Sequence, residues 1–117
     1  MPSATAPCLA VAPGLAVALV LAVVAVAAAA AGEPDAARQA ELLHRLKHDC
    51  GSCHGLTLKG GLGPPLLPAR LAGRSSDELV AVILDGVAET PMPPWQGELT
   101  PAEARWLVRM LQEGVPQ

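Results

Sequence analysis

The apolar and polar positions of this 117-residue chain follow two different patterns. Residues 1–31 carry no charged side chain, and residues 15–31 are almost entirely Ala, Val and Leu. In residues 32–117 charged side chains are interspersed with apolar ones that recur every three or four positions, which is the spacing of amphipathic helices. We therefore expect an apolar leader over residues 1–31 and one small helical domain over residues 32–117.

Three segments of the domain have helical periodicity. The first opens at Pro34 and Asp35, because proline is tolerated in a first turn and an acid there complements the helix dipole. The second opens at a capping box over residues 75–78 and weakens near Gly86, and the third opens at a capping box over residues 100–103. Their apolar faces are Leu42, Leu43 and Leu46; Leu79, Val82, Ile83 and Val87; and Ala104, Leu107, Val108 and Leu111. No segment has the pattern of a strand, so the chain is predicted to be all-α.

Two segments rich in glycine and proline lie between these helices and are predicted to be loops. The first contains Gly60, Gly61, Gly63, Pro64, Pro65 and Pro68. The second covers residues 90–95, which read Thr-Pro-Met-Pro-Pro-Trp. Because proline fixes the backbone φ angle, we expect this second loop to be extended and rigid.

The first helix leads into a Cys-x-x-Cys-His motif formed by Cys50, Cys53 and His54. This is the attachment signature of a c-type haem. The two thiols add across the two vinyl groups of one porphyrin, and the adjacent imidazole is then held beneath the iron as a proximal ligand. The motif predicts one covalent haem c.

Two other sites use paired cysteines. A zinc site needs a second pair of ligands, but the only other cysteine is Cys8 in the leader, and His44 and His48 lie upstream on the same predicted helix. A thioredoxin-like redox pair needs a βαβ context, which this pattern lacks. The surroundings of the motif therefore favour haem.

The leader has the features of an export signal. An apolar core ends in four alanines, residues 28–31, which suit a cleavage site, and the polar sequence from Gly32 follows. However, no Lys or Arg precedes the core, and the uncharged run is long enough to span a bilayer. An uncleaved membrane anchor is therefore the alternative to a cleaved signal peptide. Cys8 precedes the apolar core, so we do not expect it to carry a lipid.

Composition limits the partners and the core of the domain. All charged residues follow the leader and give a net charge of −3, without a basic stripe, which argues against nucleic acid as a partner. The chain has no Phe or Tyr, and its aromatic residues are Trp95 and Trp106. Because a domain this short buries little apolar surface, a large covalent haem would supply the missing core.

Met92 is the expected distal ligand. It lies 38 residues after His54, between two prolines that lower the entropy of presenting its side chain. Met110 lies within the third helix, where methionine usually fills a core, and the remaining methionine starts the leader. His44 and His48 are rival ligands in principle, but the helix that carries them leads into the proximal motif. We expect both on the proximal side or in solvent.

This arrangement resembles the class I cytochromes c, which have a helix ending in Cys-x-x-Cys-His, a Gly-Pro-x-Leu segment and a Met-bearing loop before a last helix. The resemblance covers about residues 35–113 and rests on Cys50, Cys53, His54, residues 63–66 and Met92. It implies about three main helices around one covalent haem c, with His54 and Met92 as axial ligands. It also implies that the carbonyl oxygen of Pro64 accepts a hydrogen bond from the proximal imidazole, which fixes the orientation of the ring.

Residues 48–66 and 90–95 are similar to the cytochromes c-55X, small periplasmic cytochromes encoded with the cytochrome cd1 nitrite reductases of denitrifying bacteria. The resemblance implies a periplasmic, non-enzymatic carrier of single electrons, with a cytochrome cd1 nitrite reductase as the redox partner. The alternative that it implies is a maturation factor for d1 haem biosynthesis or insertion. A ligand-sensing haem protein, with Met92 displaced from the iron, is a third option. We expect the apolar shell of the haem at Leu62, Leu66, Leu79, Ile83 and Trp95.

Overall fold

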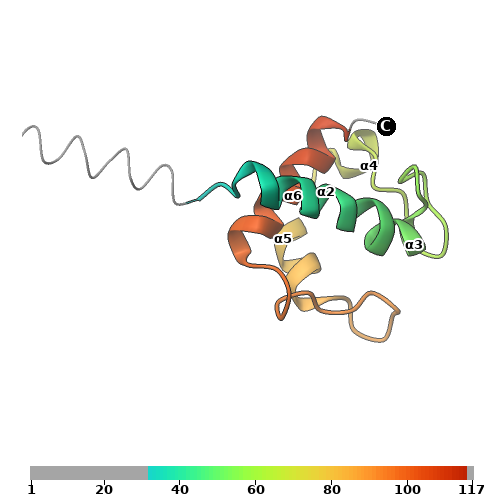
Figure 1. Ribbon diagram of the computed structural model, residues 1–117. Helices are drawn as coiled ribbons and strands as arrows, with labels where there is room; N and C mark the ends of the chain where they lie inside the picture. Colours follow the sequence, from blue (N-terminus) through green and yellow to red (C-terminus); the bar gives the residue numbers. More distant parts are fainter. Residues whose placement is uncertain (1–31, 116–117) are drawn as a thin grey trace, which may run out of the picture. The chain divides into compact units, whose positions relative to one another are not determined.

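The computed structural model describes residues 32–115, in which every regular element is a helix (Figure 1). In chain order these are α2 (Ala36–Arg45), the π-helical turn η1 (Leu46–Cys50), α3 (Gly51–His54), α4 (Pro68–Leu71), α5 (Ser76–Asp85) and α6 (Pro101–Glu113). The predicted all-α class is confirmed. The leader predicted over residues 1–31 lies outside the described residues. No helix between residues 32 and 115 is long and apolar enough to cross a membrane.

The first helical run is capped by Asp35. Its side chain accepts the backbone N–H of Arg38 at 2.8 Å, which satisfies one of the donors left unpaired at a helix start. Pro34 therefore precedes the helix instead of occupying its first turn. The helix begins at Ala36, after the Asp35 cap, and not at Pro34 as predicted.

The same run continues through η1 and α3 to the Cys-x-x-Cys-His motif. In η1 the backbone widens, so that Gly51 donates its N–H to the carbonyl oxygen of Leu46, five residues earlier. Side-chain periodicity did not predict this wide turn, since single π turns have no sequence signature of their own. The motif ends the run, as expected, because Gly55 follows with a φ of +88°.

Helix α6 is the centre of the fold, since α2, α4 and α5 all contact it (Figure 1). The predicted apolar face of α6 is buried, and Val108 is only 1% exposed. Leu42 on α2 is completely buried in the same core. Arg38 and Glu103 join α2 to α6 through an ion pair of 2.5 Å, and this arginine lowers the pKa of the Glu103 carboxyl.

The two predicted capping boxes differ in the structure. Thr100 and Glu103 form both reciprocal bonds, with Pro101 at the first helical position. Ser75 accepts the backbone N–H of Glu78, but the carboxylate of Glu78 pairs with Arg74 instead of returning to the cap. Both helices nevertheless begin at the predicted residues.

Two predicted boundaries were wrong. Helix α5 ends at Asp85, so Val87 lies outside it, because Gly86 adopts a φ of +69° and a ψ of −168°, which no helix accommodates. Pro68, predicted as part of a loop, begins the short helix α4, since proline at a first helical position loses no hydrogen bond. The rest of the glycine-proline segment and residues 90–95 are loops, as predicted.

Candidate functional site

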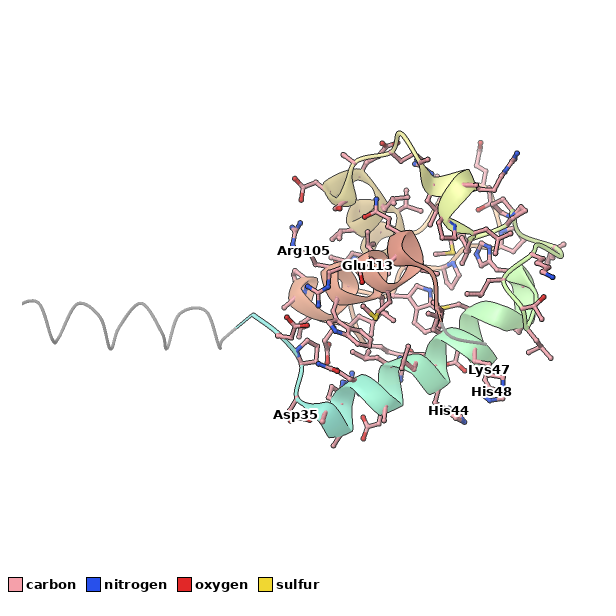
Figure 2. All side chains as sticks on the ribbon, turned by 90° about the horizontal axis from the view of Figure 1, so that it is seen from above. Asp35, His44, Lys47, His48, Arg105 and Glu113 are labelled. Atoms are coloured by element: carbon pink, nitrogen blue, oxygen red, sulfur yellow. The ribbon has the colours of Figure 1, made fainter. Side chains whose placement is uncertain are left out.

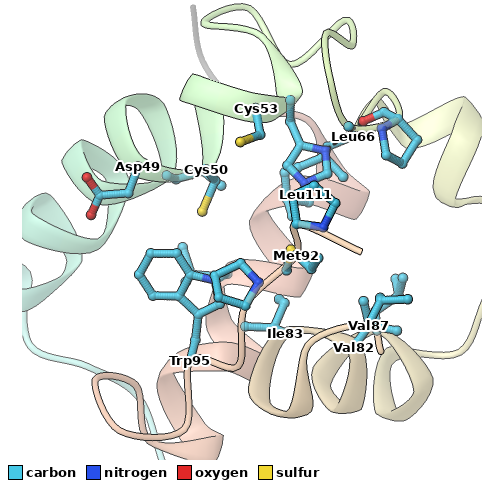
Figure 3. Close-up of a pocket in the computed structure, with 18 of the residues that line it drawn as sticks. Asp49, Cys50, Cys53, Leu66, Val82, Ile83, Val87, Met92, Trp95 and Leu111 are labelled. Atoms are coloured by element: carbon cyan, nitrogen blue, oxygen red, sulfur yellow. Dashed lines mark hydrogen bonds between the residues drawn. The ribbon is translucent and has the colours of Figure 1, made fainter. Parts of the chain in front are cut away.

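A largely apolar cavity of about 730 Å³ lies between the Cys-x-x-Cys-His helix, α5 and the two loops. This volume is in the range of sites that hold cofactors and small molecules. Cys50 and Cys53 face the cavity from one side, while Met92, Val82 and Ile83 face it from the other (Figure 3). The cavity therefore brings together the predicted attachment residues and the predicted distal ligand, which are far apart in sequence.

His54 is oriented by a hydrogen bond to the following loop. Its Nδ1 lies 2.7 Å from the carbonyl oxygen of Pro64. Because a carbonyl oxygen only accepts hydrogen bonds, Nδ1 carries the proton, and Nε2 of the neutral ring keeps a lone pair for a metal. Such a bond fixes the tautomer and raises the basicity of an imidazole ligand.

Gly63 packs directly against the imidazole of His54. A Cβ on Gly63 would lie 2.8 Å from both Cε1 and Nδ1 of the ring, so any side chain here would push the imidazole away. The backbone N–H of Gly63 also bonds to the carbonyl oxygen of Cys53 at 2.8 Å. Gly63 was expected only as part of the Gly-Pro-x-Leu segment, and its contact with the ring was not predicted.

The thiol of Cys50 is protonated at neutral pH. Burial raises its pKa to about 11, and the neighbouring Asp49 carboxylate adds to the increase. Redox-active Cys-x-x-Cys motifs have the opposite property, because their nucleophilic cysteine has a lowered pKa. This environment argues against a thioredoxin-like role for the pair.

The segment that presents Met92 is closed by hydrogen bonds among Val87, Thr90 and Met92. The carbonyl oxygen of Met92 accepts the N–H of Val87 at 3.1 Å. The backbone N–H of Met92 donates to Thr90 Oγ1 at 3.2 Å. The Thr90 hydroxyl in turn donates to the carbonyl oxygen of Val87 at 2.8 Å. Residues 87–92 therefore form a small closed ring that holds Met92 in place.

Gly86 lies under this ring in a conformation that other residues rarely adopt. Its φ is +69°, and a Cβ on it would lie 2.7 Å from the Met92 carbonyl oxygen and 2.8 Å from Pro94 N. From the sequence, Gly86 was expected only to weaken a helix. The structure shows that it allows the Met92 segment to approach α5.

The five apolar residues predicted to surround the haem all line the cavity: Leu62, Leu66, Leu79, Ile83 and Trp95. Leu79 is buried, whereas Leu62 is 78% exposed. The cavity is therefore apolar inside and open to solvent near Leu62.

Two arginines that the sequence analysis missed also line the cavity. The guanidinium of Arg45 lies 5.7 Å from the centre of the Trp95 ring, 2.5 Å from Glu98 and 3.7 Å from Asp49. This cluster joins the end of α2 to the segment after Met92. Arg74 is paired with Glu78 at 2.7 Å. No sequence signal links Arg45 to Glu98, which is 53 residues away.

The rival ligands lie elsewhere. His44 and His48 are exposed on the outer face of their helix and do not line the cavity. Met110 packs partly buried against the core, also outside the cavity. Between residues 32 and 115, no group of three or more His, Cys, Asp or Glu side chains is placed to hold a metal ion. The zinc alternative thus has no support from the described part of the chain.

The residues present fit a covalent haem. Two thiols three positions apart, an imidazole with its Nδ1 already bonded and a thioether on the facing wall are the donor set of such a site. The apolar walls provide the low-polarity surroundings that a porphyrin requires.

Comparisons with known proteins agree with this donor set. A family described as cytochrome c oxidase, cbb3-type, subunit III, matches residues 35–111. Cytochrome c55X of Pseudomonas aeruginosa is 58% identical over 81 residues, which are 69% of this chain and 68% of that protein. Cytochrome c55X of Paracoccus denitrificans is 56% identical over 81 residues, 69% of this chain and 79% of that protein.

Solved structures give the same result. A c-type cytochrome named NirC superimposes with a TM-score of 0.69 at 57% identity, over 70% of this chain and 96% of that one. The dihydro-heme d1 dehydrogenase NirN, in complex with DHE, superimposes with a TM-score of 0.56 at 36% identity, over 62% of this chain but only 16% of that one. The cavity, its donor set and these similarities together place the chain in the cytochrome c55X family of c-type cytochromes.

Proposed function

We propose that this protein carries single electrons by means of one haem c attached at Cys50 and Cys53. The observation that carries the proposal is that His54, Met92 and both cysteines line one apolar cavity, with Met92 facing the cysteines across it. When bound, the haem supplies an iron that cycles between the ferrous and ferric states. His54 and Met92 would hold this iron.

The surrounding residues set how readily the iron is reduced. Pro64 holds the imidazole of His54 in one tautomer through the 2.7 Å hydrogen bond. A methionine ligand raises the reduction potential relative to a second histidine. Leu79 and Ile83 give the cavity apolar walls, which would disfavour the extra charge of the ferric state. We propose no catalytic residue, because electron transfer needs no acid–base group.

We further propose that the protein is exported and works in the periplasm with a cytochrome cd1 nitrite reductase as its redox partner. Two observations support this: the apolar leader over residues 1–31, and the 56–58% identity to two cytochromes c55X. Redox encounters of this kind have small, transient interfaces. Lys59, exposed in the loop after His54, is a charge that would steer the encounter. Contact with a membrane is expected only if the leader stays attached.

The alternative is a role in making or inserting d1 haem. It is favoured by the similarity to a dihydro-heme d1 dehydrogenase of Pseudomonas aeruginosa, 38% identical over 66% of this chain and 15% of that protein. Electron transfer would still be the chemistry that this chain contributes. The electrons would serve to produce mature reductase instead of reducing nitrite.

One experiment separates these roles. Nitrite reductase is purified from a strain lacking this gene, and its d1 haem content and turnover are measured. The donor role predicts a full complement of d1 haem, slow turnover in cells, and rapid reoxidation of the reduced cytochrome by enzyme plus nitrite. An empty d1 site in otherwise intact reductase would instead support the maturation role.

A further inference from the structure

His44 and His48 form a pair of imidazoles on the outer face of the helix that leads to the haem motif. Their ring centroids are 4.3 Å apart, with the ring planes tilted by 38°. Both side chains are exposed, and they project away from the core next to Lys47 (Figure 2). The proposed electron-transfer role uses neither of them.

The backbone explains why the two rings are so close. His44 lies in the last turn of α2, and His48 lies within η1. In a regular α-helix a residue four positions later is rotated by about 40° around the axis. A π turn advances each residue by a smaller angle, so the offset between the two side chains falls. The junction between α2 and η1 therefore brings the two imidazoles nearer to one line parallel to the helix axis.

The neighbouring polar groups leave this pair available. The Glu41 carboxylate, one turn before His44, is paired with Arg38 at 2.8 Å. The Ser52 hydroxyl, one turn after His48, donates to the carbonyl oxygen of Asp49 at 2.6 Å. Neither group is directed to the two imidazoles by a contact in the structure.

We propose that His44 and His48 bind one divalent transition-metal ion as a two-imidazole chelate, with water in the remaining coordination positions. Two histidines four positions apart on one helix face are the arrangement by which helices hold zinc. Imidazole suits Cu²⁺, Ni²⁺ and Zn²⁺, and Cu²⁺ should bind most tightly of these. The site would be separate from the haem, because neither histidine lines the cavity.

Lys47 makes the site weaker than its ligands alone would allow. Its ammonium group lies on the same exposed face and repels a bound cation. Removing this charge should therefore strengthen binding, whereas removing either imidazole should abolish the chelate. The two kinds of substitution predict changes of opposite sign.

The test uses purified haem-loaded protein titrated with Zn²⁺ by calorimetry and with Cu²⁺ by electron paramagnetic resonance. We expect one ion per chain, with nitrogen hyperfine structure from two imidazoles on the copper signal. His44→Gln and His48→Gln should each remove this binding, and Lys47→Gln should tighten it. An unchanged haem spectrum and melting temperature in each variant would show that the fold is intact.

Two results would overturn the proposal. One is the same affinity and stoichiometry in the wild-type protein and the double variant, which would place bound metal elsewhere, such as at the amino terminus. The other is no binding of either ion to the wild-type protein. Both results leave the haem proposal unaffected, since they concern groups outside the cavity.

Discussion

Gly86 and the Met92 carbonyl oxygen are so close that a Cβ on the glycine would lie 2.7 Å from that oxygen. The glycine ends α5 with a φ of +69°, and Val87 after it bonds to the same oxygen. The position of the proposed distal ligand thus depends on the absence of a side chain six residues earlier.

Gly86→Ala should displace the Met92 segment. The backbone conformation alone costs about 1–3 kcal/mol for a residue with a Cβ, and the steric contact with Met92 adds to that cost. We expect a loss of the weak red-region charge-transfer band of methionine-ligated ferric haem, together with a lower melting temperature. Gly97→Ala is the matched control, because nothing lies within 4 Å of a Cβ at that position. Equal effects of the two substitutions would contradict this account of the loop.

Met92→Ala and Met110→Ala should separate ligation from packing. Removing the thioether of Met92 should abolish the charge-transfer band and lower the reduction potential, because methionine ligation favours ferrous iron. Met110 is only partly buried outside the cavity, so its truncation should cost less than the roughly 2–5 kcal/mol of a fully buried residue and leave the band intact. The ligand assignment fails if the two effects are reversed.

Arg45→Gln should lower the reduction potential. The substitution leaves Asp49, which lines the cavity, and Glu98 without their shared cation, and negative charge near the cavity would stabilise ferric haem. The expected change is on the order of 1 kcal/mol, since the charges are partly hydrated. Arg105→Gln removes a comparable ion pair, 2.7 Å from Asp77, away from the cavity. Protein-film voltammetry of both variants should show a shift for Arg45→Gln alone.

The protein isolated from its native envelope should begin near Gly32. Residues 28–31 offer small side chains suited to cleavage, and the polar domain follows directly. Intact-mass measurement of the soluble fraction checks this expectation. A full-length chain recovered only from membranes would show that the leader is an anchor.

Local interactions made much of this fold predictable from the sequence. The cap at Thr100 and the burial of Val108 follow from residues within one or two turns of each other. The π turn and the helix starting at Pro68 did not, because a π turn has no sequence signature of its own and Pro68 ends a glycine- and proline-rich run that is typical of loops. The candidate site residues Cys50 and Cys53 were predictable, because the motif that contains them spans only five positions.

Long-range contacts explain what the sequence could not provide about the site. Arg45 reaches Glu98 across 53 residues, and Gly63 lies against the ring of His54 only after the loop has folded back. Neither relationship has a periodicity or a motif. Apart from Pro64, which the family resemblance named, the residues that hold the ligands in place were therefore found from the structure, whereas the proposed ligands were found from residue type and spacing.

We propose above all that the cavity holds one haem c bound covalently to Cys50 and Cys53. The most direct test is acid–organic extraction of the purified protein followed by denaturing intact-mass measurement. We expect a mass equal to the mature chain plus one haem, with no haem in the organic phase. Extraction of all the haem, or an unmodified chain with one equivalent of zinc, would contradict it.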